Sequence, residues 1–522
     1  MRAFERTDQE DARALMGRKI LFVTTDQQRY DALGCNGGQV ARTPVVDALA
    51  ASGVNYRRAH NQNVVCMPAR STMLTGQYVR THGVFANGVP LPQDAPSVAA
   101  VLADAGYRTA LIGKAHFEPG FDLEARWPEN TFGRQGREPS YGPHRGFEHL
   151  ELSMHGPLPF WHYGSWLNAE HPDEVGGFYA LFKDGVLNSD GGGDTGLEQV
   201  ARNSIPREHY HTDWVADRAI AWLDMLDAAA DWFVWLSFPD PHHPWDPPAA
   251  EVSRVDWREL ELPAGHPGSI DACRDVLAGK PRHWLDWFDG RFDNREGGPA
   301  GFVPAAMTHD QVREVNALVH VENELIDEAL GRVLRRIDER GWADDTDVLF
   351  TTDHGELQGD FGLLFKGPYH CDALMRVPLV WRPARSAGVQ PGEITDPVGH
   401  VDLAPTFCAI AGVGAPEWMQ GSRLPVTDGS GRERMITEWD SQFDDYHLRS
   451  IYRDGWVCTA YEPGGGYDGT EGELYDLGDD PLQFHNRWYD LASASLRSDL
   501  VADLHDHLPP ARSPRLEVEA PV

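Results

Sequence analysis

The chain has 522 residues, a hydrophobic fraction of 41% and 17 tryptophans, enough to bury a large core in one large domain and a smaller one. Its formal net charge of −34, from 80 acidic and 46 basic residues, argues against nucleic acids and anionic membrane surfaces as partners. An anionic substrate would therefore need a local basic pocket.

The cysteines and the N-terminal residues indicate a compartment. The six cysteines are widely spaced and form no Cys-x-x-Cys pair; they are Cys35, Cys66, Cys273, Cys371, Cys408 and Cys458. This spacing is typical of reduced thiols rather than a disulfide framework or a zinc site. Residues 1–17, expected as an N-terminal extension, lack the apolar stretch of a signal peptide, and no apolar run approaches membrane-spanning length. We expect a cytoplasmic protein with no membrane partner.

Apolar runs alternate with helical patterns along most of the chain. Core strands are predicted at residues 19–25, 108–112, 232–238, 347–352 and 376–381, and helices at 43–53, 97–106, 212–226 and 308–341. Thr212 is the expected cap of one helix, and Thr308 with Gln311 forms a capping box at the start of another. This alternation predicts an α/β domain over residues 18–420, with a mostly parallel sheet and helices on both faces.

Two irregular stretches interrupt the alternation. Residues 117–210 and 246–305 are rich in Gly, Pro and Trp, and we interpret them as insertions that shape a cleft. Their aromatic residues could line a subsite or simply pack; they include Trp161, Tyr163, Trp166, Trp284 and Trp287. After residue 420 the segments shorten, so residues 421–522 are predicted to form a small α+β subdomain with a short antiparallel sheet.

Polar residues that suit a metal follow the predicted strands. Asp26 and Gln27, Lys114 and His116, His242, and Asp353 and His354 stand at strand ends, while Cys66, Arg70 and Lys366 lie on neighbouring turns. The carboxyl ends of strands in an open α/β sheet are common site positions. Carboxylates, an amide and an imidazole suit one divalent cation. Individually, Asp26 and Asp353 could be helix caps, and a single Lys or His could be solvated or packed.

The stretch from Asn63 to Gly76 suggests an anion site. Cys66 precedes Pro68, which suits the first turn of a helix, and Arg70 adds a fixed cation close by. A buried structural cysteine before an ordinary helix is the alternative.

The order of these residues resembles the sulfatase family, the formylglycine-dependent branch of the alkaline phosphatase superfamily. Cys66-Met-Pro68-Ala-Arg70 followed by Leu74-Thr75-Gly76 is similar to the family signature. Further similar motifs are Thr25-Asp26-Gln27-Gln28-Arg29, Gly113-Lys114-Ala115-His116, Pro241-His242-His243-Pro244, Thr352-Asp353-His354-Gly355-Glu356, Lys366-Gly-Pro and Gly472-Glu-Leu-Tyr-Asp-Leu477. The resemblance extends from about residue 18 to about residue 490 and implies an alkaline-phosphatase-like fold.

The resemblance also implies a mechanism. Cys66 would be oxidised to Cα-formylglycine by a formylglycine-generating enzyme, and its hydrate would attack a small-molecule sulfate ester. The implied metal ligands are Asp26, Gln27, Cys66, Asp353 and His354. The implied catalytic residues are Cys66, Arg70, Lys114, His116, His242 and Lys366. Of these, Arg70, Lys114, His242 and Lys366, together with Asn87, would bind the substrate.

Two positions depart from the common sulfatase pattern. Gln27 stands where many sulfatases have an acid, and His354 where they have Asn. We expect Ca²⁺ as the metal, and these two departures make Mn²⁺ the alternative. His354 and the Asn87-Gly-Val-Pro-Leu91 segment also resemble the phosphonate monoester hydrolases, which supply the alternative activity. A third interpretation is a catalytically silent binding protein with unmodified Cys66. A homo-oligomer is possible.

Overall fold

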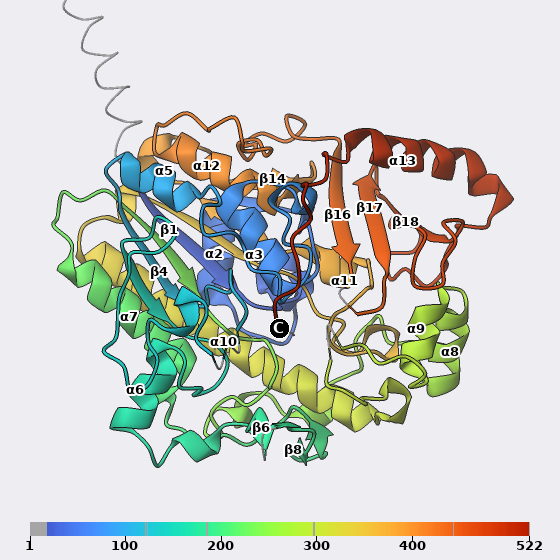
Figure 1. Ribbon diagram of the computed structural model, residues 1–522, viewed down its shortest axis with the longest axis horizontal. Coiled ribbons are helices and arrows are strands. Elements are labelled where there is room, and N and C mark those ends of the chain that lie inside the picture. The colour runs from blue at the N-terminus through green and yellow to red at the C-terminus, as the bar shows by residue number, and fades with distance from the viewer. Residues whose placement is uncertain are drawn as a thin grey trace, which may run out of the picture.

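The computed structural model describes residues 18–520, except 121, 123, 184–185, 296–297 and 442; the expected extension 1–17 lies outside them. Its main element is a mixed sheet of eight strands (Figure 1). In sheet order these are β14 (Gly392–Ile394), β2 (Val54–Tyr56), β13 (Leu379–Arg382), β11 (Thr346–Thr352), β1 (Lys19–Thr25), β10 (Trp232–Ser237), β4 (Arg108–Gly113) and β5 (His149–Leu152). Strands β11, β1, β10, β4 and β5 run parallel, as predicted.

Helices cover both faces of this sheet because the central strands are apolar on both sides. Ile20 and Phe22 of β1 pack into one core cluster, and Leu21 and Val23 pack into another on the opposite face. The first face is covered by α3 (Cys66–Thr75), α5 (Val98–Asp104) and α12 (Leu403–Ile410). The second face is covered by α2 (Pro44–Ser52), α6 (His162–Glu170), α7 (His211–Met225) and α10 (His309–Glu339).

Smaller elements complete the large domain. The remaining helices here are α4 (Val79–His82), α8 (Ile270–Ala278), α9 (Arg282–Phe288) and α11 (Asp372–Met375). A three-stranded sheet contains β12 (Arg376–Val377), β3 (Ala59–His60) and β15 (Val398–Gly399), and two hairpins pair β6 (Phe182–Lys183) with β7 (Val186–Leu187) and β8 (Gly191–Gly192) with β9 (Leu197–Glu198). Within the part of the chain that the structure describes, no helix combines the length and apolar character needed to cross a membrane.

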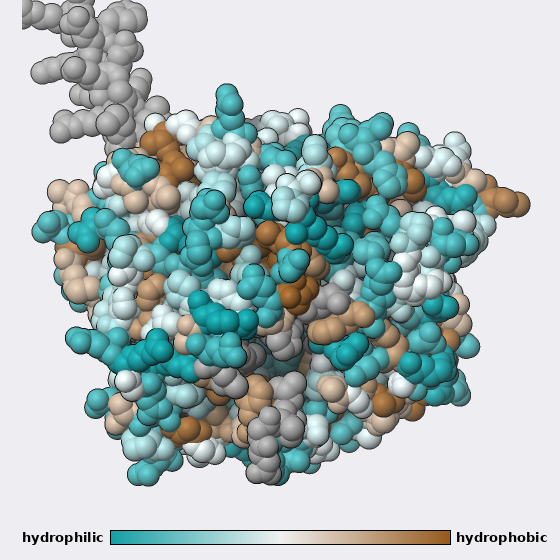
Figure 2. Space-filling model, in the orientation of Figure 1, coloured by the Kyte–Doolittle hydropathy of each residue, from teal (hydrophilic) through white to brown (hydrophobic). Residues whose placement is uncertain are grey.

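The C-terminal residues form a four-stranded antiparallel sheet, as predicted. Its strands are β16 (Arg434–Asp440), β17 (His447–Arg453), β18 (Trp456–Tyr461) and β19 (Gly472–Asp476), and α13 (Ala494–His507) packs on it. Ile451 and Cys458 from the sheet meet Leu500 and Leu504 of α13 in a small separate core. The face of the molecule in Figure 2 is largely hydrophilic, with small hydrophobic patches.

Three sequence predictions need correction. The predicted strand 376–381 is broken at Pro378: its first part joins the three-stranded sheet, and its second part, β13, pairs antiparallel with β11. Thr212 does not cap α7; it lies inside the helix, and its hydroxyl donates to Asp240. Residues 117–210 are not only an insertion, because they contain β5, which forms the sheet edge beside β4. Such a short edge strand leaves little pattern in the sequence.

The capping box of α10 gives a stability prediction. Thr308 Oγ1 accepts a hydrogen bond from Gln311 N at 3.2 Å, and Gln311 Oε1 accepts one from Thr308 N at 2.8 Å. We expect Thr308→Ala to lower the free energy of unfolding by about 1 kcal/mol. The midpoint of guanidinium unfolding measures the change. Thr308→Ser, which keeps the hydroxyl, is the control; equal losses in both variants would contradict a capping role.

Candidate active site

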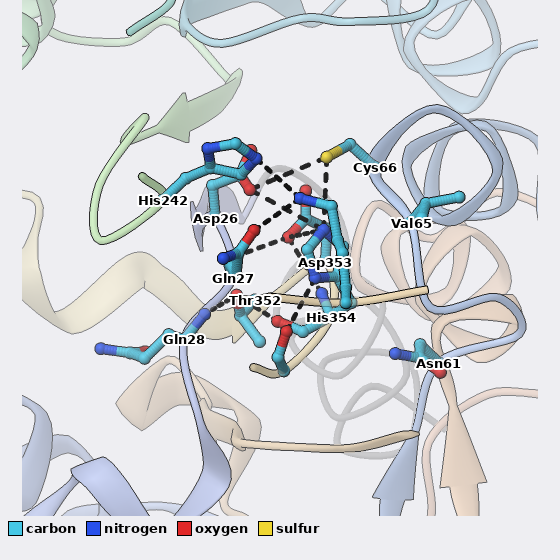
Figure 3. A network of polar contacts seen from close by, with 12 residues as sticks. Asp26, Gln27, Gln28, Asn61, Val65, Cys66, His242, Thr352, Asp353 and His354 are labelled. Atoms are coloured by element: carbon cyan, nitrogen blue, oxygen red, sulfur yellow. Dashed lines mark hydrogen bonds and ion pairs between the residues drawn. The ribbon is translucent and has the colours of Figure 1, made fainter. Parts of the chain in front are cut away.

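The predicted site residues converge at one edge of the large sheet. β1, β10 and β11 are parallel neighbours, so their carboxyl ends meet. Asp26 and Gln27 follow β1, Asp353 and His354 follow β11, and Cys66 begins α3 beside them (Figure 3). Of these side chains none is exposed by more than 2%. Asp26, Gln27, Asp353 and His354 thus lie at strand ends, as predicted, and Cys66 lies at a neighbouring helix start.

Four of these side chains form a cluster that could hold a metal. One ligand atom each from Asp26, Cys66, Asp353 and His354 lies within 4.8 Å of all the others. Cys66 Sγ is 3.2 Å from His354 Nε2 and 3.8 Å from Asp26 Oδ1. His354 Nδ1 lies 2.9 Å from the carbonyl oxygen of Gly355, which can only accept, so Nδ1 carries the proton. Nε2 therefore presents a lone pair to the cluster, as a metal ligand must.

Arg70 ties the two carboxylates of the cluster together. Its Nε donates to Asp353 Oδ2 at 2.8 Å, and its Nη2 donates to Asp26 Oδ2 at 3.2 Å. Nη1 donates to Lys114 O and Ser237 Oγ, both at 2.9 Å. Every nitrogen of this fully buried guanidinium thus donates to a protein acceptor. Its observed contacts orient the carboxylates, and direct contact with substrate remains a prediction.

Two buried lysines lie beside the cluster. Lys114 Nζ pairs with Asp26 and lies 3.8 Å from Cys66 Sγ. Burial opposes ionisation of Asp26, but Lys114 and Arg70 outweigh it and hold the pKa of this carboxyl well below its ordinary value. Lys366 Nζ donates to Gln27 Oε1 at 2.5 Å and lies 2.7 Å from His242 Nε2. The two ammonium groups make this part of an acidic protein locally basic.

Gln27 is held in a defined orientation. Its Nε2 donates to Glu356 Oε2 at 2.5 Å and lies 3.2 Å from His243 Nδ1, so the amide oxygen faces Lys366. Burial raises the pKa of Glu356 to about 7. In this geometry Gln27 Oε1 binds a lysine, and its role as a metal ligand stays a prediction.

The two predicted acid–base histidines differ in their surroundings. Both ring nitrogens of His116 are buried without a hydrogen-bond partner in the described structure, and its backbone φ is +59°. A buried histidine without a partner and with left-handed backbone is strained, which is typical of functional positions. The Nε2 atom of His242 faces Lys366. Burial, together with nearby lysine charge, keeps the pKa of both imidazoles well below the ordinary value, so each is neutral.

Asn87 contacts the backbone of Met67, the residue that follows Cys66. Its Oδ1 accepts from Met67 N at 3.0 Å, which satisfies a free amide in the first turn of α3. The role of Asn87 in substrate binding stays a prediction.

Sequence reasoning missed several residues of the site. His155 Nε2 lies 3.2 Å from Lys114 Nζ, and its ring stacks on His242 with centroids 4.2 Å apart. Nothing local in the irregular Met154-His155-Gly156 stretch indicates this position. Glu356 and His243, in contrast, stand within motifs that the sequence displays. The aromatic residues Tyr163, Trp284 and Trp287 are buried in core clusters, so for them the packing interpretation holds.

The contact between His155 and Lys114 gives a test. We expect His155→Ala to lower kcat/KM by about 10-fold, since Lys114 loses a group that orients its ammonium. His149→Ala is the matched control, because His149 lies in the same segment but contacts Glu151 instead. Steady-state kinetics at matched folded concentrations measure both. An unchanged kcat/KM in His155→Ala would show that Asp26 alone positions Lys114.

Comparison with known proteins agrees with this geometry. The model of the sulfatase family matches residues 18–413, more than half of the chain. The chain belongs to the sulfatase family. It is a hydrolase that acts on sulfuric esters. A second family model, that of the N-sulphoglucosamine sulphohydrolase C-terminal region, matches residues 359–509.

Relatives of this sulfatase cover nearly its whole length. It is 27% identical to the uncharacterized sulfatase YidJ of Escherichia coli over 504 residues, which are 95% of this chain and 88% of the relative. It is 26% identical to an arylsulfatase of Clostridium perfringens, with 83% and 81% of the two chains covered. Among solved structures, the phosphonate monoester hydrolase of Silicibacter pomeroyi matches with a TM-score of 0.74 at 24% identity, covering 95% and 96%. That likeness shows the shared fold.

Proposed function

We propose that this sulfatase cleaves a sulfate monoester with a nucleophile made from Cys66 by oxidation to Cα-formylglycine. The observation that carries the proposal is the position of Cys66, which begins α3 with its sulfur among Asp26, His354 and Lys114. Once formed, the hydrated aldehyde supplies an oxygen nucleophile and can expel sulfate by returning to the aldehyde. A formylglycine-generating enzyme is the maturation partner that this chemistry needs.

The donor set fits one divalent cation. Asp26, Asp353, His354 and the oxidised side chain at position 66 would hold it, with Gln27 as a further ligand if its amide oxygen leaves Lys366. Two carboxylates with an amide favour Ca²⁺, and the imidazole of His354 also accommodates Mn²⁺. Such an ion supplies Lewis acidity at the sulfate group.

The remaining residues bind the sulfate and move protons. Lys114 lies 3.8 Å from Cys66 Sγ and Lys366 lies beside Gln27 and His242, where their ammonium groups would balance charge on the sulfate oxygens. Neutral His116, with both ring nitrogens free, can accept the second proton of the aldehyde hydrate. His242 and Lys366 face each other at 2.7 Å and can deliver a proton to the departing alkoxide. Asn87 would add a contact to the substrate through Nδ2.

A phosphonate monoester hydrolase is the second candidate. The presence of His354 in the candidate metal cluster favours it, together with the fold shared with the phosphonate monoester hydrolase of Silicibacter pomeroyi.

The proposed location is the cytoplasm. It is supported by the six cysteines, which are all free thiols.

The test is a substrate panel on matured protein with defined metal. We expect faster hydrolysis of sulfate esters than of phosphonate monoesters with the same leaving group, because the chain belongs to the sulfatase family. Released inorganic sulfate and phosphonate are measured directly. Much faster hydrolysis of the phosphonates would establish the second candidate instead.

The same panel tests the proton donor. We expect His242→Ala to slow esters of poor leaving groups, such as alkyl alcohols, about 100-fold more than 4-nitrophenyl sulfate, whose leaving group needs little protonation. A plot of log kcat/KM against leaving-group pKa should become steeper in the variant. Equal slopes for the variant and the wild type would show that His242 does not donate a proton to the leaving group.

A further inference from the structure

Two histidines and one glutamate meet in the large domain outside the site at Cys66. One ligand atom each from His171, Glu174 and His209 lies within 4.8 Å of the other two, and none of the three belongs to the candidate metal cluster at Cys66. His171 directly follows α6, Glu174 comes three residues later, and His209 lies two residues before α7. Figure 1 shows α6 at the lower left, across the molecule from α13.

The three side chains lie at distances that suit a small metal ion. His209 Nδ1 is 2.8 Å from Glu174 Oε2, and His171 Nδ1 is 3.9 Å from Glu174 Oε1. The two imidazole rings are stacked, with centroids 3.7 Å apart. Ligand atoms in a tetrahedral zinc site lie about 2.0–2.2 Å from the metal, and therefore roughly 3.3 Å from each other. The observed distances fall on either side of this value, so small side-chain rotations bring the three ligand atoms to one ion.

Glu174 supplies a negative charge that no fixed cation balances. Its carboxylate contacts the two histidines, and in the part of the chain that the structure describes no lysine or arginine lies within ion-pair distance of it. Two imidazoles in such close contact repel each other when both are protonated, whereas two neutral rings can share one cation. Two neutral imidazoles and one carboxylate are a ligand set that zinc takes in proteins.

The three residues are held in place by contacts of their own. The backbone N–H of His171 closes the last turn of α6 with a hydrogen bond of 2.9 Å, and Glu174 N donates to His171 O at 3.0 Å. His209 O accepts a hydrogen bond from the hydroxyl of Tyr163 at 3.0 Å. The ring of Trp166 packs in a T-shaped arrangement on both imidazoles, with centroid distances of 5.2 and 5.9 Å. Little conformational freedom is therefore left to lose when an ion binds.

From this arrangement we infer that His171, Glu174 and His209 form a second metal site, for Zn²⁺ or a similar transition-metal ion. Two imidazoles select such ions over Ca²⁺, which prefers a shell of oxygen ligands. The three side chains are half-buried, so water completes the coordination. The ion joins the end of α6 to the residues before α7, and its role is structural.

The loop that this ion closes, residues 172–208, also pairs with a segment after β10. Trp245 N donates to Gln199 O at 2.8 Å, and Ala249 N donates to Asn203 O at 2.6 Å. An ion that binds the folded loop and not the unfolded chain stabilises the folded state by mass action. Zinc therefore stabilises the closed loop together with this pairing.

Zinc content after equilibrium dialysis, measured by inductively coupled plasma mass spectrometry, tests the site. We expect the wild type to retain one more Zn²⁺ per chain than the double variant His171→Ala/His209→Ala at about 10 µM free Zn²⁺. Zinc bound at Cys66 is common to both proteins and cancels in the difference. At free zinc of about 100 times the Kd, the melting temperature of the wild type should rise by about 2–3 °C more than that of the double variant.

Two further variants complete the test. Glu174→Gln keeps the shape of the side chain but removes its charge, and should weaken zinc binding at least about tenfold. His447→Ala is the matched control, because His447 lies 2.7 Å from Asp440 and 3.1 Å from Asp445 but belongs to no candidate metal cluster of the described residues. Equal zinc content in the wild type and the double variant, or an equal loss in His447→Ala, overturns the site.

Discussion

Cys66→Ala is expected to abolish sulfate ester hydrolysis, with a loss of at least about 10⁴-fold in kcat. The substitution removes the thiol, without which Cβ of residue 66 cannot be oxidised to the proposed aldehyde. The fold should persist, because Cys66 is the first residue of α3, where an alanine fits without loss of a cap. Release of sulfate from 4-nitrophenyl sulfate and the far-ultraviolet circular dichroism spectrum measure the two effects.

Cys458→Ala is the matched control for this experiment. Cys458 is also free and buried, but it lies in β18 within the small core of the C-terminal sheet. The Cys458→Ala substitution should lower the free energy of unfolding and leave kcat unchanged. Mass spectrometry of the peptide containing residue 66 completes the test, since oxidation of the thiol to the aldehyde lowers the mass of that peptide. A thiol at full occupancy in active protein would contradict the proposed nucleophile.

Asp26→Asn is expected to remove both metal and activity, with a loss of at least about 10³-fold in kcat. This carboxylate is fully buried and lies within reach of Arg70 at 3.2 Å, Lys114 and His354. The neutral amide no longer balances the buried positive charges of Arg70 and Lys114. The free energy of unfolding should therefore also fall, by about 3–5 kcal/mol. Metal content by mass spectrometry and kcat with excess Ca²⁺ or Mn²⁺ measure the effects.

Asp327→Asn separates the loss of a ligand from the general cost of replacing a buried aspartate. Asp327 accepts hydrogen bonds from Val45 N at 3.0 Å and Val46 N at 2.9 Å at the start of α2. It is not a member of the candidate metal cluster. Its replacement should cost about 1 kcal/mol and leave metal content unchanged. If Asp26→Asn retained a full complement of metal, the assignment of Asp26 as a ligand would have to be abandoned.

These two experiments also distinguish the remaining interpretations. A catalytically silent binding protein, which the family assignment argues against, would have an unmodified thiol at Cys66 and no ester hydrolysis in the wild type. The two hydrolase interpretations predict the same losses for both variants, so only the ester panel separates sulfate from phosphonate. Removal of metal by a chelator should reproduce the Asp26→Asn phenotype reversibly.

Local sequence was sufficient to predict the frame of the site. The strands before Asp26, Lys114, His242 and Asp353 are continuous apolar runs, and a run of that kind predicts a buried strand whatever surrounds it. Parallel neighbours then place the polar residues after each strand at one edge of the sheet. The helix start at Cys66 was likewise predictable, since Pro68 and Gly76 mark the two ends of α3.

The orientations and partners of those residues came only from the tertiary structure. Gln27 points its oxygen at Lys366 because Glu356, 329 residues along the chain, holds its nitrogen. His155 reaches Lys114 from a stretch without periodicity. Pro378 divides one apolar run between two sheets, and its second part, β13, runs antiparallel to β11. A local pattern reports whether a residue is buried, whereas hydrogen-bond partners depend on segments brought together by the packing of the whole domain. The position of Cys66 at the start of α3 was therefore predictable from sequence, and the network that surrounds it was decided by the fold.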